Sequence, residues 1–374
     1  MQLSFLRPIY ARPGPWASIY LDASRDTETS RPEVGLRWRA LQETLIEQGA
    51  DRETIGALDA AVRGHDPLAG DYGMAAFATA GQVVLTEYLS APPMKDLAAY
   101  GPVPHAMPLV AQRREEVPWV RVVADRTGAD VDAVDVGGVS RHALVRGGNQ
   151  YPIRRVKAGS WSQPHYQKAA MMAWKHNAGD AAAATAELAE AVGAEVVIVA
   201  GDVRAANMLA ARLPERWQDR VVQTDAGART AGAKPDALDD VTVQAIAEVA
   251  AEHAGVTLDK FGMQQNVGAG LDASVAALQR GQVDTMLLVD DPSSTEQLWI
   301  GPDPTDIATT AEELTALAVA DPIRVRADAA LVRALVGTDA GITVLTPEEA
   351  PELADGVGVV LRYVDASTPA GGDG

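Results

Sequence analysis

The spacing of apolar residues along the chain predicts a mixture of strands and helices. Short apolar runs bounded by turn residues predict strands, and longer stretches with apolar residues three and four apart predict helices. In the first third these patterns predict a strand at 16–22, a helix from about 33, a helix at 52–63, and a hairpin of 72–78 with 83–88. This mixture indicates an α/β domain.

Closely spaced prolines then interrupt the pattern between residues 92 and 118 and predict a domain boundary near residue 117. Beyond it we expect paired strands at 120–124 and 131–136, a long alanine-rich helix at about 165–192, a strand at 195–200, a helix at 204–213 and a strand at 220–224. Such alternation suits a parallel or mixed sheet. Small residues at 224–237 predict a linker.

The last third repeats the alternation of helices and strands. We expect helices at 241–254, 271–280 and 327–336, strands at 285–290 and 357–363, an acidic loop at 291–311, and a disordered tail from about 366. The sequence therefore predicts an α/β protein of three domains, at 1–117, 118–237 and 238–374, with mixed sheets and flanking helices.

Composition narrows the class of protein. No apolar run approaches the length that crosses a bilayer, and residues 1–15 lack the pattern of a signal peptide, so we expect a cytoplasmic protein without membrane contact. Cysteine is absent, which excludes disulfides, thiolate nucleophiles and cysteine-based metal sites.

The charge distribution is uneven. The net charge is −19, yet no Asp or Glu occurs between Asp135 and Asp180. This stretch carries seven basic residues, Arg141, Arg146, Arg154, Arg155, Lys157, Lys168 and Lys175, and also His142, His165, His176, Tyr151, Trp161, Tyr166 and Trp174. Basic groups beside aromatic rings suit phosphate contact and base stacking on RNA. The alternative is a solvated basic face that balances acidic parts of the same chain.

One segment of the last third carries a family resemblance. Residues 270–289, GLDASVAALQRGQVDTMLLV, resemble the third domain of the archaeo-eukaryotic release factors and Pelota in their order of helix, Ala-Leu, Gly-Xaa-Val and apolar strand. The middle third is similar too, with a strand pair, a loop, a long helix and an apolar strand ending in Ala200-Gly201. The chain most resembles the bacterial branch of this superfamily, which includes ribosome hibernation factors.

The resemblance implies binding to the ribosomal A site, with contacts to ribosomal RNA of both subunits. It would direct the middle domain towards the peptidyl-transferase centre, the first towards the decoding centre, and the third towards a translational GTPase such as elongation factor Tu. It implies no DNA partner.

The sequence departs from the family pattern at the position that carries catalysis. Release factors hydrolyse peptidyl-tRNA with a Gly-Gly-Gln loop before the long helix, and here Gly159-Ser160-Trp161-Ser162-Gln163 occupies that place. A bulky Trp161 should obstruct a loop whose glycines let the backbone approach a reacting centre. Gly147-Gly148-Asn149-Gln150 lies too far before the helix, and we interpret it as a hairpin turn. We therefore expect no catalytic residue. Stop-codon motifs are also not visible in the first domain.

Other chemistry has weaker support. The three clustered histidines are too widely spaced for a helical metal pair. We interpret Asp290-Asp291 as a strand-end turn and Val199 to Asp202 as strand-to-helix packing, and Ser160 and Ser162 lack a defined base. The sequence thus predicts neither a metal nor a cofactor.

These observations predict a hibernation factor that occupies the A site without cleaving peptidyl-tRNA. The predicted RNA contacts are Arg141, Arg146, Arg154, Arg155, Lys157, Gly159, Ser160, Trp161, Ser162, Gln163, His165, Tyr166, Lys168, Lys175 and, in the first domain, Lys95 and Tyr100. Two alternatives remain. One is a rescue-type peptidyl-tRNA hydrolase or release factor that uses Gln163, and the other is a stress-related protein-interaction factor that binds no RNA.

Overall fold

A computed structural model describes residues 1–24, 30–64, 72–89, 91–115, 117–136, 140–146, 163–227, 236–264 and 268–363. For residues 30–32, 115, 163–174 and 236 it describes the backbone alone. The chain forms two compact units: unit 1 is Met1–Arg114 with Ala254–Gly374, and unit 2 is Glu115–His253. The expected division into three domains stays a prediction.

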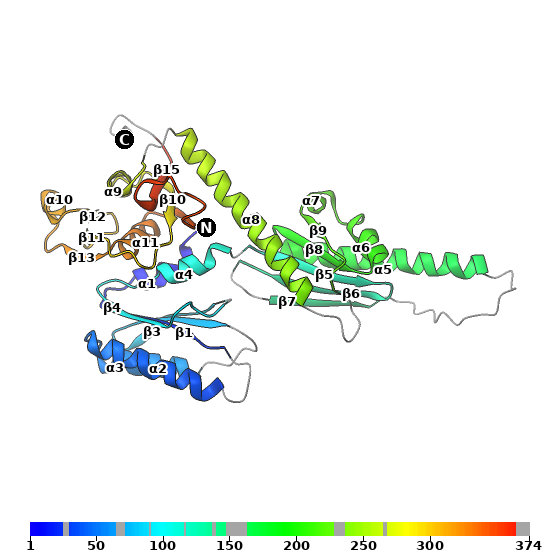
Figure 1. Cartoon of the computed structure of the whole chain (residues 1–374), viewed down its shortest axis with the longest axis horizontal. Helices are drawn as coiled ribbons and strands as arrows, with labels where there is room; N and C mark the ends of the chain where they lie inside the picture. The colour runs from blue at the N-terminus through cyan, green and yellow to red at the C-terminus, as the bar shows by residue number, and fades with distance from the viewer. Residues whose placement is uncertain are drawn as a thin grey trace. The chain divides into compact units, whose positions relative to one another are not determined.

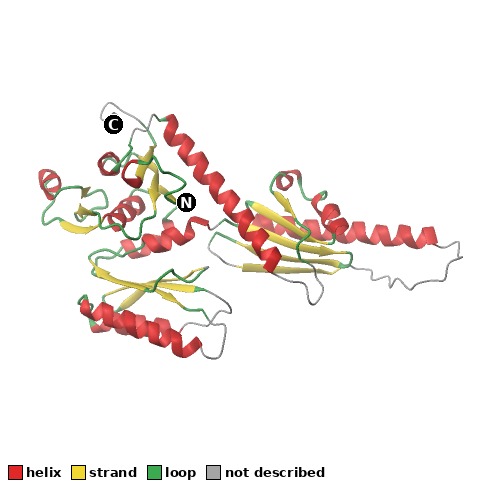
Figure 2. Cartoon of the chain, in the orientation of Figure 1, coloured by secondary structure: helices red, strands yellow, loops and turns green. Residues whose placement is uncertain are grey.

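The N-terminal part of unit 1 is a four-stranded antiparallel sheet in the order β3-β2-β1-β4. Its strands are β1 (Trp16–Asp22), β2 (Gly73–Thr79), β3 (Gln82–Leu89) and β4 (Leu97–Gly101). Helices α2 (Ser30–Glu47) and α3 (Arg52–Gly64) cover one face, as Figure 2 shows. On the other face, Tyr20 and Phe77 join a core with the C-terminal part of the unit. Because β1 and β2 are covered on both faces, they are apolar along almost their whole length.

The proline-rich stretch contains regular structure that the sequence did not predict. It holds β4, helix α4 (Met107–Gln112) and the 3-10 helix η2 (Arg113–Glu115). Pro108 lies in the first turn of α4, where a missing N–H costs nothing because first-turn donors have no partner within the helix. The chain also begins with the 3-10 helix η1 (Ser4–Leu6) and helix α1 (Arg7–Tyr10).

The C-terminal part of unit 1 contains two three-stranded sheets. In the first, β10 (Val283–Val289) lies between the parallel strand β14 (Gly341–Leu345) and the antiparallel strand β15 (Val357–Leu361), the last preceded by the 3-10 helix η3 (Ala354–Gly356). Helices α9 (Leu271–Gln279) and α11 (Ala327–Gly337) pack into the same core. The predicted helices at 271–280 and 327–336 and the predicted strands at 285–290 and 357–363 are confirmed, whereas β14 was not predicted.

The second sheet of this part contradicts the predicted acidic loop at 291–311. It has the order β12-β11-β13, formed by β11 (Gln297–Ile300), β12 (Ile307–Ala308) and β13 (Ile323–Arg326), with α10 (Ala311–Ala316) beside it. Leu298, Ile300 and Ile307 are buried in the core of unit 1. Strands β11 and β12 are too short for a pattern of their own, and they form because β11 pairs with both β12 and β13.

Unit 2 is built on a five-stranded mixed sheet in the order β7-β6-β5-β8-β9 (Figure 1). Its strands are β5 (Trp119–Asp125), β6 (Gly128–Val134), β7 (Ser140–Arg146), β8 (Val196–Gly201) and β9 (Val221–Gln223). Strands β5, β6 and β7 pair antiparallel, whereas β5, β8 and β9 are parallel. The predicted strand pair and mixed sheet are confirmed, although β6 ends two residues before the predicted end of its strand.

Helices cover both faces of this sheet. Helix α5 (Gln163–Val192) and helix α6 (Val203–Ala210) lie on one face, where alanines such as Ala182 and Ala186 permit a close approach to Val120 and Val122. The first half of α8 (Asp236–Met263) packs on the other face through Leu238 and Ala245, and the short helix α7 (Glu215–Gln218) precedes β9. The predicted long helix is confirmed. Among the helices that the structure describes, none is both long and apolar enough to cross a membrane.

Candidate RNA interface

Only part of the predicted RNA-contact set falls within the structure. Arg154, Arg155, Lys157, Gly159, Ser160, Trp161 and Ser162 lie outside the described residues. Gln163, His165, Tyr166 and Lys168 lie in the first two turns of α5, where the structure describes the backbone alone. Side chains are described for Arg141, Arg146, Lys175, Lys95 and Tyr100. The described interface must therefore be built from these residues and their neighbours.

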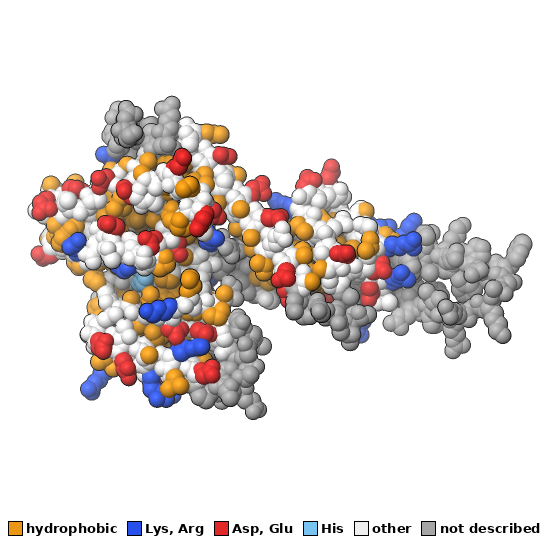
Figure 3. All heavy atoms as spheres, in the orientation of Figure 1, with side chains coloured by type: hydrophobic (Ala, Val, Ile, Leu, Met, Phe, Trp, Pro, Cys, Tyr) orange, Lys and Arg blue, Asp and Glu red, His pale blue; other side chains and the backbone are white. Residues whose placement is uncertain are grey.

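One edge of the unit 2 sheet gathers basic residues from four segments. Strands β5 and β8 are parallel, so they end at the same edge, where Ala124 lies opposite Gly201. Strand β7 also ends there, because Arg146 lies opposite Gly128, the first residue of β6. Arg126 in the β5–β6 turn, Arg146, Lys175 on α5 and Arg204 on α6 surround this edge, and we call these four residues the basic edge. Figure 3 shows Lys and Arg side chains gathered at this end of unit 2.

Two glycines let the strands meet closely at this edge. A Cβ at Gly201 would lie 2.1 Å from the carbonyl oxygen of Ala124, and the φ of Gly201 is +108°. A Cβ at Gly128 would lie 2.0 Å from the carbonyl oxygen of Val145. Any side chain at either position would push the neighbouring strand away. The glycine of the Val199 to Asp202 segment thus serves the close pairing of β8 with β5.

Asp202 fixes the junction between β8 and α6. Its carboxylate caps α6 by accepting hydrogen bonds from the backbone N–H groups of Arg204 and Ala205, both at 3.1 Å. The other oxygen lies 3.5 Å from a guanidinium nitrogen of Arg126. The amino end of α6 is thus already occupied by a carboxylate, and it offers no free site for a phosphate.

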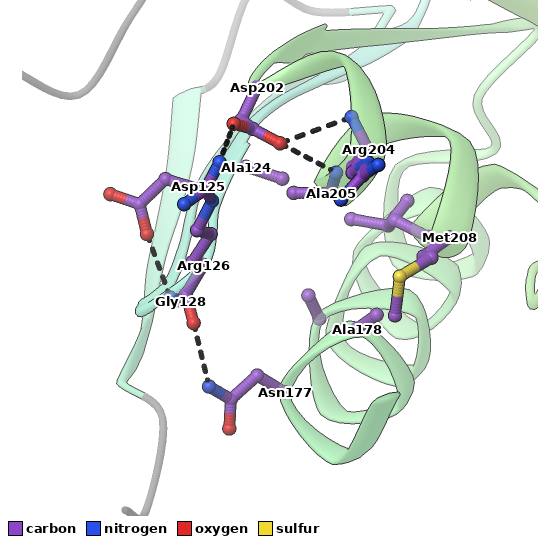
Figure 4. A pocket seen from close by; sticks show the side chains of 12 residues that line it. Ala124, Asp125, Arg126, Gly128, Asn177, Ala178, Asp202, Arg204, Ala205 and Met208 are labelled. Atoms are coloured by element: carbon purple, nitrogen blue, oxygen red, sulfur yellow. Dashed lines mark hydrogen bonds and ion pairs between the residues drawn. The ribbon is translucent and has the colours of Figure 1, made fainter. Parts of the chain in front are cut away.

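The β5–β6 turn is held from both sides, as Figure 4 shows. Asp125 accepts hydrogen bonds from the backbone N–H groups of Thr127 and Gly128, at 2.6 and 3.0 Å. The side-chain amide of Asn177 on α5 donates to the carbonyl oxygen of Arg126, at 3.1 Å. These contacts fix the backbone from which the Arg126 side chain extends.

The pocket between these elements is too small for a base or a nucleotide. It is lined by Arg126, Asn177, Asp202, Arg204 and Met208 among others, and it has room for about one water molecule. Any contact with a larger anion must come from the side chains around its mouth. The Arg126 side chain is 51% exposed, and Arg146, Lys175 and Arg204 are exposed. Within the described ranges, the last three have no ion-pair partner. Such an edge attracts a phosphate backbone and supplies little base specificity.

Arg141 lies apart from the basic edge, and two of the clustered histidines lie beside carboxylates. Arg141 lies opposite Ala133, five residues before Arg146 and so about 17 Å away along the strand. His142 contacts Asp132 at 2.8 Å, and His176 lies 3.6 Å from Asp180. Across the described part of the chain, no group of three or more His, Cys, Asp or Glu side chains is arranged to hold a metal ion.

The two predicted contacts of the first domain lie in unit 1. Lys95 is exposed in the loop before β4. Tyr100 lies on β4 and packs against the core beneath α2 and α3. Its backbone N–H donates to the side chain of Gln48 at 2.7 Å, and burial raises the pKa of its hydroxyl. Its half-buried ring offers less surface for base stacking than a free side chain would.

Sequence patterns did not identify Arg126 and Arg204. Both lie outside the acid-free stretch and have acidic neighbours, namely Asp125 and Asp202. They lie near Arg146 and Lys175 only because β5 pairs with β8 and because α5 packs on the same sheet. No local signal in the sequence marks either residue.

The sequence of the chain is similar to those of known proteins. Residues 118–266 match the family described as Bacterial archaeo-eukaryotic release factor family 2. The uncharacterized proteins MT2704 and Rv2629 of Mycobacterium tuberculosis, from strains CDC 1551 / Oshkosh and ATCC 25618 / H37Rv, are each 30% identical over 369 residues, which cover 97% of both chains.

Solved structures show weaker likeness. A model of ribosome-bound archaeal Pelota and ABCE1 is 14% identical with a TM-score of 0.41, and the match covers 96% of this chain and 93% of that one. Pelota of Archaeoglobus fulgidus is 16% identical with a TM-score of 0.34, over 78% of this chain and 80% of that one. Because both scores are low, membership rests on the sequence matches. The chain belongs to the bacterial branch of the archaeo-eukaryotic release factor superfamily.

Proposed function

We propose that this protein is a ribosome hibernation factor of the Balon type, which binds the ribosomal A site in the cytoplasm and blocks translation without hydrolysing peptidyl-tRNA. In this proposal unit 2 supplies the contacts to ribosomal RNA. A translational GTPase such as elongation factor Tu assists binding. The block is steric, because a bound chain excludes aminoacyl-tRNA from the same site.

The basic edge is the observation that carries RNA binding. A chain with a net charge of −19 is repelled by RNA on average. Arg126, Arg146, Lys175 and Arg204 nevertheless converge on one edge of unit 2, where two carboxylates are engaged in local hydrogen bonds. The same edge leads into residues 147–162, which add Arg154, Arg155 and Lys157 in sequence. Several phosphate contacts can therefore form at this edge of unit 2.

The absence of peptide release follows from the sequence before α5. Helix α5 begins at Gln163, and the four residues before it are Gly159, Ser160, Trp161 and Ser162 in place of a glycine pair. Without adjacent glycines the backbone cannot approach a crowded reaction centre in the same way. We therefore propose no catalytic role for this segment.

Salt dependence of ribosome binding tests the role of the basic edge. Each lost phosphate contact should lower the slope of log affinity against log salt by about 1. We expect Lys175→Gln with Arg204→Gln to lower the slope by about 2 in co-sedimentation with vacant ribosomes. Arg280→Gln with Arg324→Gln removes the same charge from exposed positions of unit 1 and should leave the slope unchanged. Equal slopes for the two double variants would refute the assigned interface.

One observation favours a second function, a rescue-type peptidyl-tRNA hydrolase. Gln163 is the first residue of the long helix α5, next to the loop before this helix that carries the catalytic glutamine in the release factor pattern. Incubation with ribosomes that carry peptidyl-tRNA distinguishes the two functions. The hibernation proposal expects inhibition of cell-free translation with no released peptide. Peptide release that Gln163→Ala abolishes would establish the hydrolase instead.

A further inference from the structure

Unit 1 contains a groove that the proposed RNA interface does not use. It lies beyond the carboxyl end of β10, and the amino ends of α9 and α11, the loop 290–296 and η3 surround it. Its volume is about 740 Å³, within the range of ligand-binding clefts. The carboxyl ends of parallel strands such as β10 and β14 are where α/β folds place their ligands.

The floor of the groove is apolar and its rim is acidic. Leu271, Leu288, Leu331 and Val357 are among the apolar residues that line it, together with Met107 at the start of α4. Its charged lining residues are six carboxylates and one guanidinium: Asp272, Asp290, Asp291, Glu296, Asp328, Asp355 and Arg326. Figure 3 also shows frequent Asp and Glu side chains over the part of unit 1 that carries α9 and α10. Such a surface repels RNA and attracts cationic groups.

Some of these carboxylates already have partners within the unit. Asp355 accepts a hydrogen bond from the backbone N–H of Leu271 at 3.1 Å, and so caps α9. Asp328 accepts from Arg326, with its shortest contact at 2.8 Å, and from the backbone N–H of Ala329. One backbone N–H at the start of each helix, and the one guanidinium that lines the groove, are therefore already engaged by carboxylates of the same unit. An anion gains nothing by entering.

Three carboxylates remain available. Within the described residues, the side chains of Asp272, Asp290 and Glu296 have no hydrogen-bond or ion-pair partner. Asp290 is half-buried, and its burial together with the nearby charge of Asp328 raises its pKa. Arg114, whose positive charge acts to lower this pKa, is already paired with Glu349 at 3.0 Å. A positive charge from outside would relieve the repulsion at Asp290.

We propose that this groove binds a positively charged segment of a partner protein, in which Lys or Arg side chains flank an apolar side chain. The basic side chains contact Asp290 and Glu296, and the apolar side chain packs on Leu288 and Leu331. The acidic rim requires a partner with positive charge. The apolar floor favours a segment with an apolar side chain over a polyamine, which has none. The protein then carries two surfaces of opposite charge, one for RNA on unit 2 and one for a basic protein segment on unit 1.

Peptide binding to the full chain tests this proposal. The probe is a fluorescent nine-residue peptide of three Lys-Lys-Leu repeats, measured by fluorescence anisotropy. We expect Asp290→Asn to weaken binding about tenfold, because a half-buried charge pair is lost. Glu312→Gln removes an equal charge from the exposed surface of α10 and should change affinity less than about twofold. Asp290→Asn keeps the size of the side chain and removes charge repulsion, so the thermal unfolding midpoint of this variant should not fall. A lower midpoint would show that the variant loses binding because it is unfolded.

Two matched comparisons make the outcome decisive. A peptide of three Lys-Lys-Gly repeats should bind about tenfold more weakly than the leucine peptide, because it buries no apolar side chain. Spermine should compete poorly. Equal binding of the two peptides, or displacement by spermine at equal charge concentration, would establish a site for cations alone and overturn the proposal. Equal losses in Asp290→Asn and Glu312→Gln would show only attraction to an acidic chain, and would overturn it as well.

Discussion

Substitution of Asp202 separates the local stability of unit 2 from the charge of its basic edge. Asp202→Ala removes the cap of α6, which costs about 1 kcal/mol, and the contact with Arg126. That contact adds at most about 1 kcal/mol, because both side chains are partly exposed. Asp202→Asn keeps a good capping side chain and removes only the charge. The alanine variant should therefore lose about 1–2 kcal/mol of local stability, and the asparagine variant clearly less.

Hydrogen exchange on a peptide that covers α6 measures this difference directly. Exchange in Asp202→Ala should accelerate about 5- to 30-fold relative to the parent protein, whereas Asp202→Asn should stay within about threefold. Both variants make the basic edge more positive, so both should elute from heparin at higher salt. Equal acceleration in the two variants would refute the capping role of the side chain. Unchanged heparin elution would refute the electrostatic link to the basic edge.

Two further predictions concern stability. Gly201→Ala should destabilise unit 2 by about 2–4 kcal/mol in urea unfolding, because its Cβ would meet the Ala124 carbonyl at a positive φ. Gly179→Ala on α5, where a Cβ meets nothing within 4 Å, should instead stabilise it by about 0.5–1 kcal/mol. Burial lowers the pKa of His105 below its usual 6.5, so the unfolded chain takes up the proton first as pH falls. The stability that the protein has above about pH 6.5 should be lost as the pH falls below this value. Urea unfolding midpoints measured above and below about pH 6.5 should therefore change less in His105→Asn than in the parent protein.

Elements with a pattern of their own were predictable from the sequence. The apolar runs of β1, β2 and β8 are continuous because helices or a second core cover both faces of their sheets. Helix α5 was predicted from the length of its alanine-rich stretch. In contrast, β4 and α4 lie among prolines, and β11 and β12 are too short for periodicity, so the patterns there predicted irregular chain.

Some residues of the candidate site were likewise predictable from the sequence, and others were not. The acid-free stretch drew attention to Arg146 and Lys175, and the structure brings these two residues to one edge. The contribution of Arg154, Arg155 and Lys157 stays a prediction, since they lie outside the described residues. Arg126 and Arg204 could not be identified, because each has an acidic residue within two positions in the sequence and its local charge is balanced.

By itself the sequence determined the alternation of helices and strands, the superfamily, and the sign of the charge in the middle of the chain. These properties are local, or are carried by short motifs that keep their order. Only the tertiary structure decided which distant segments meet. The parallel pairing of β5 with β8 built the basic edge, and the convergence of α9, α11 and the loop 290–296 built the acidic groove. Such pairings depend on the free energy of burying apolar surface from many residues at once. This free energy cannot be deduced from any single segment of the sequence.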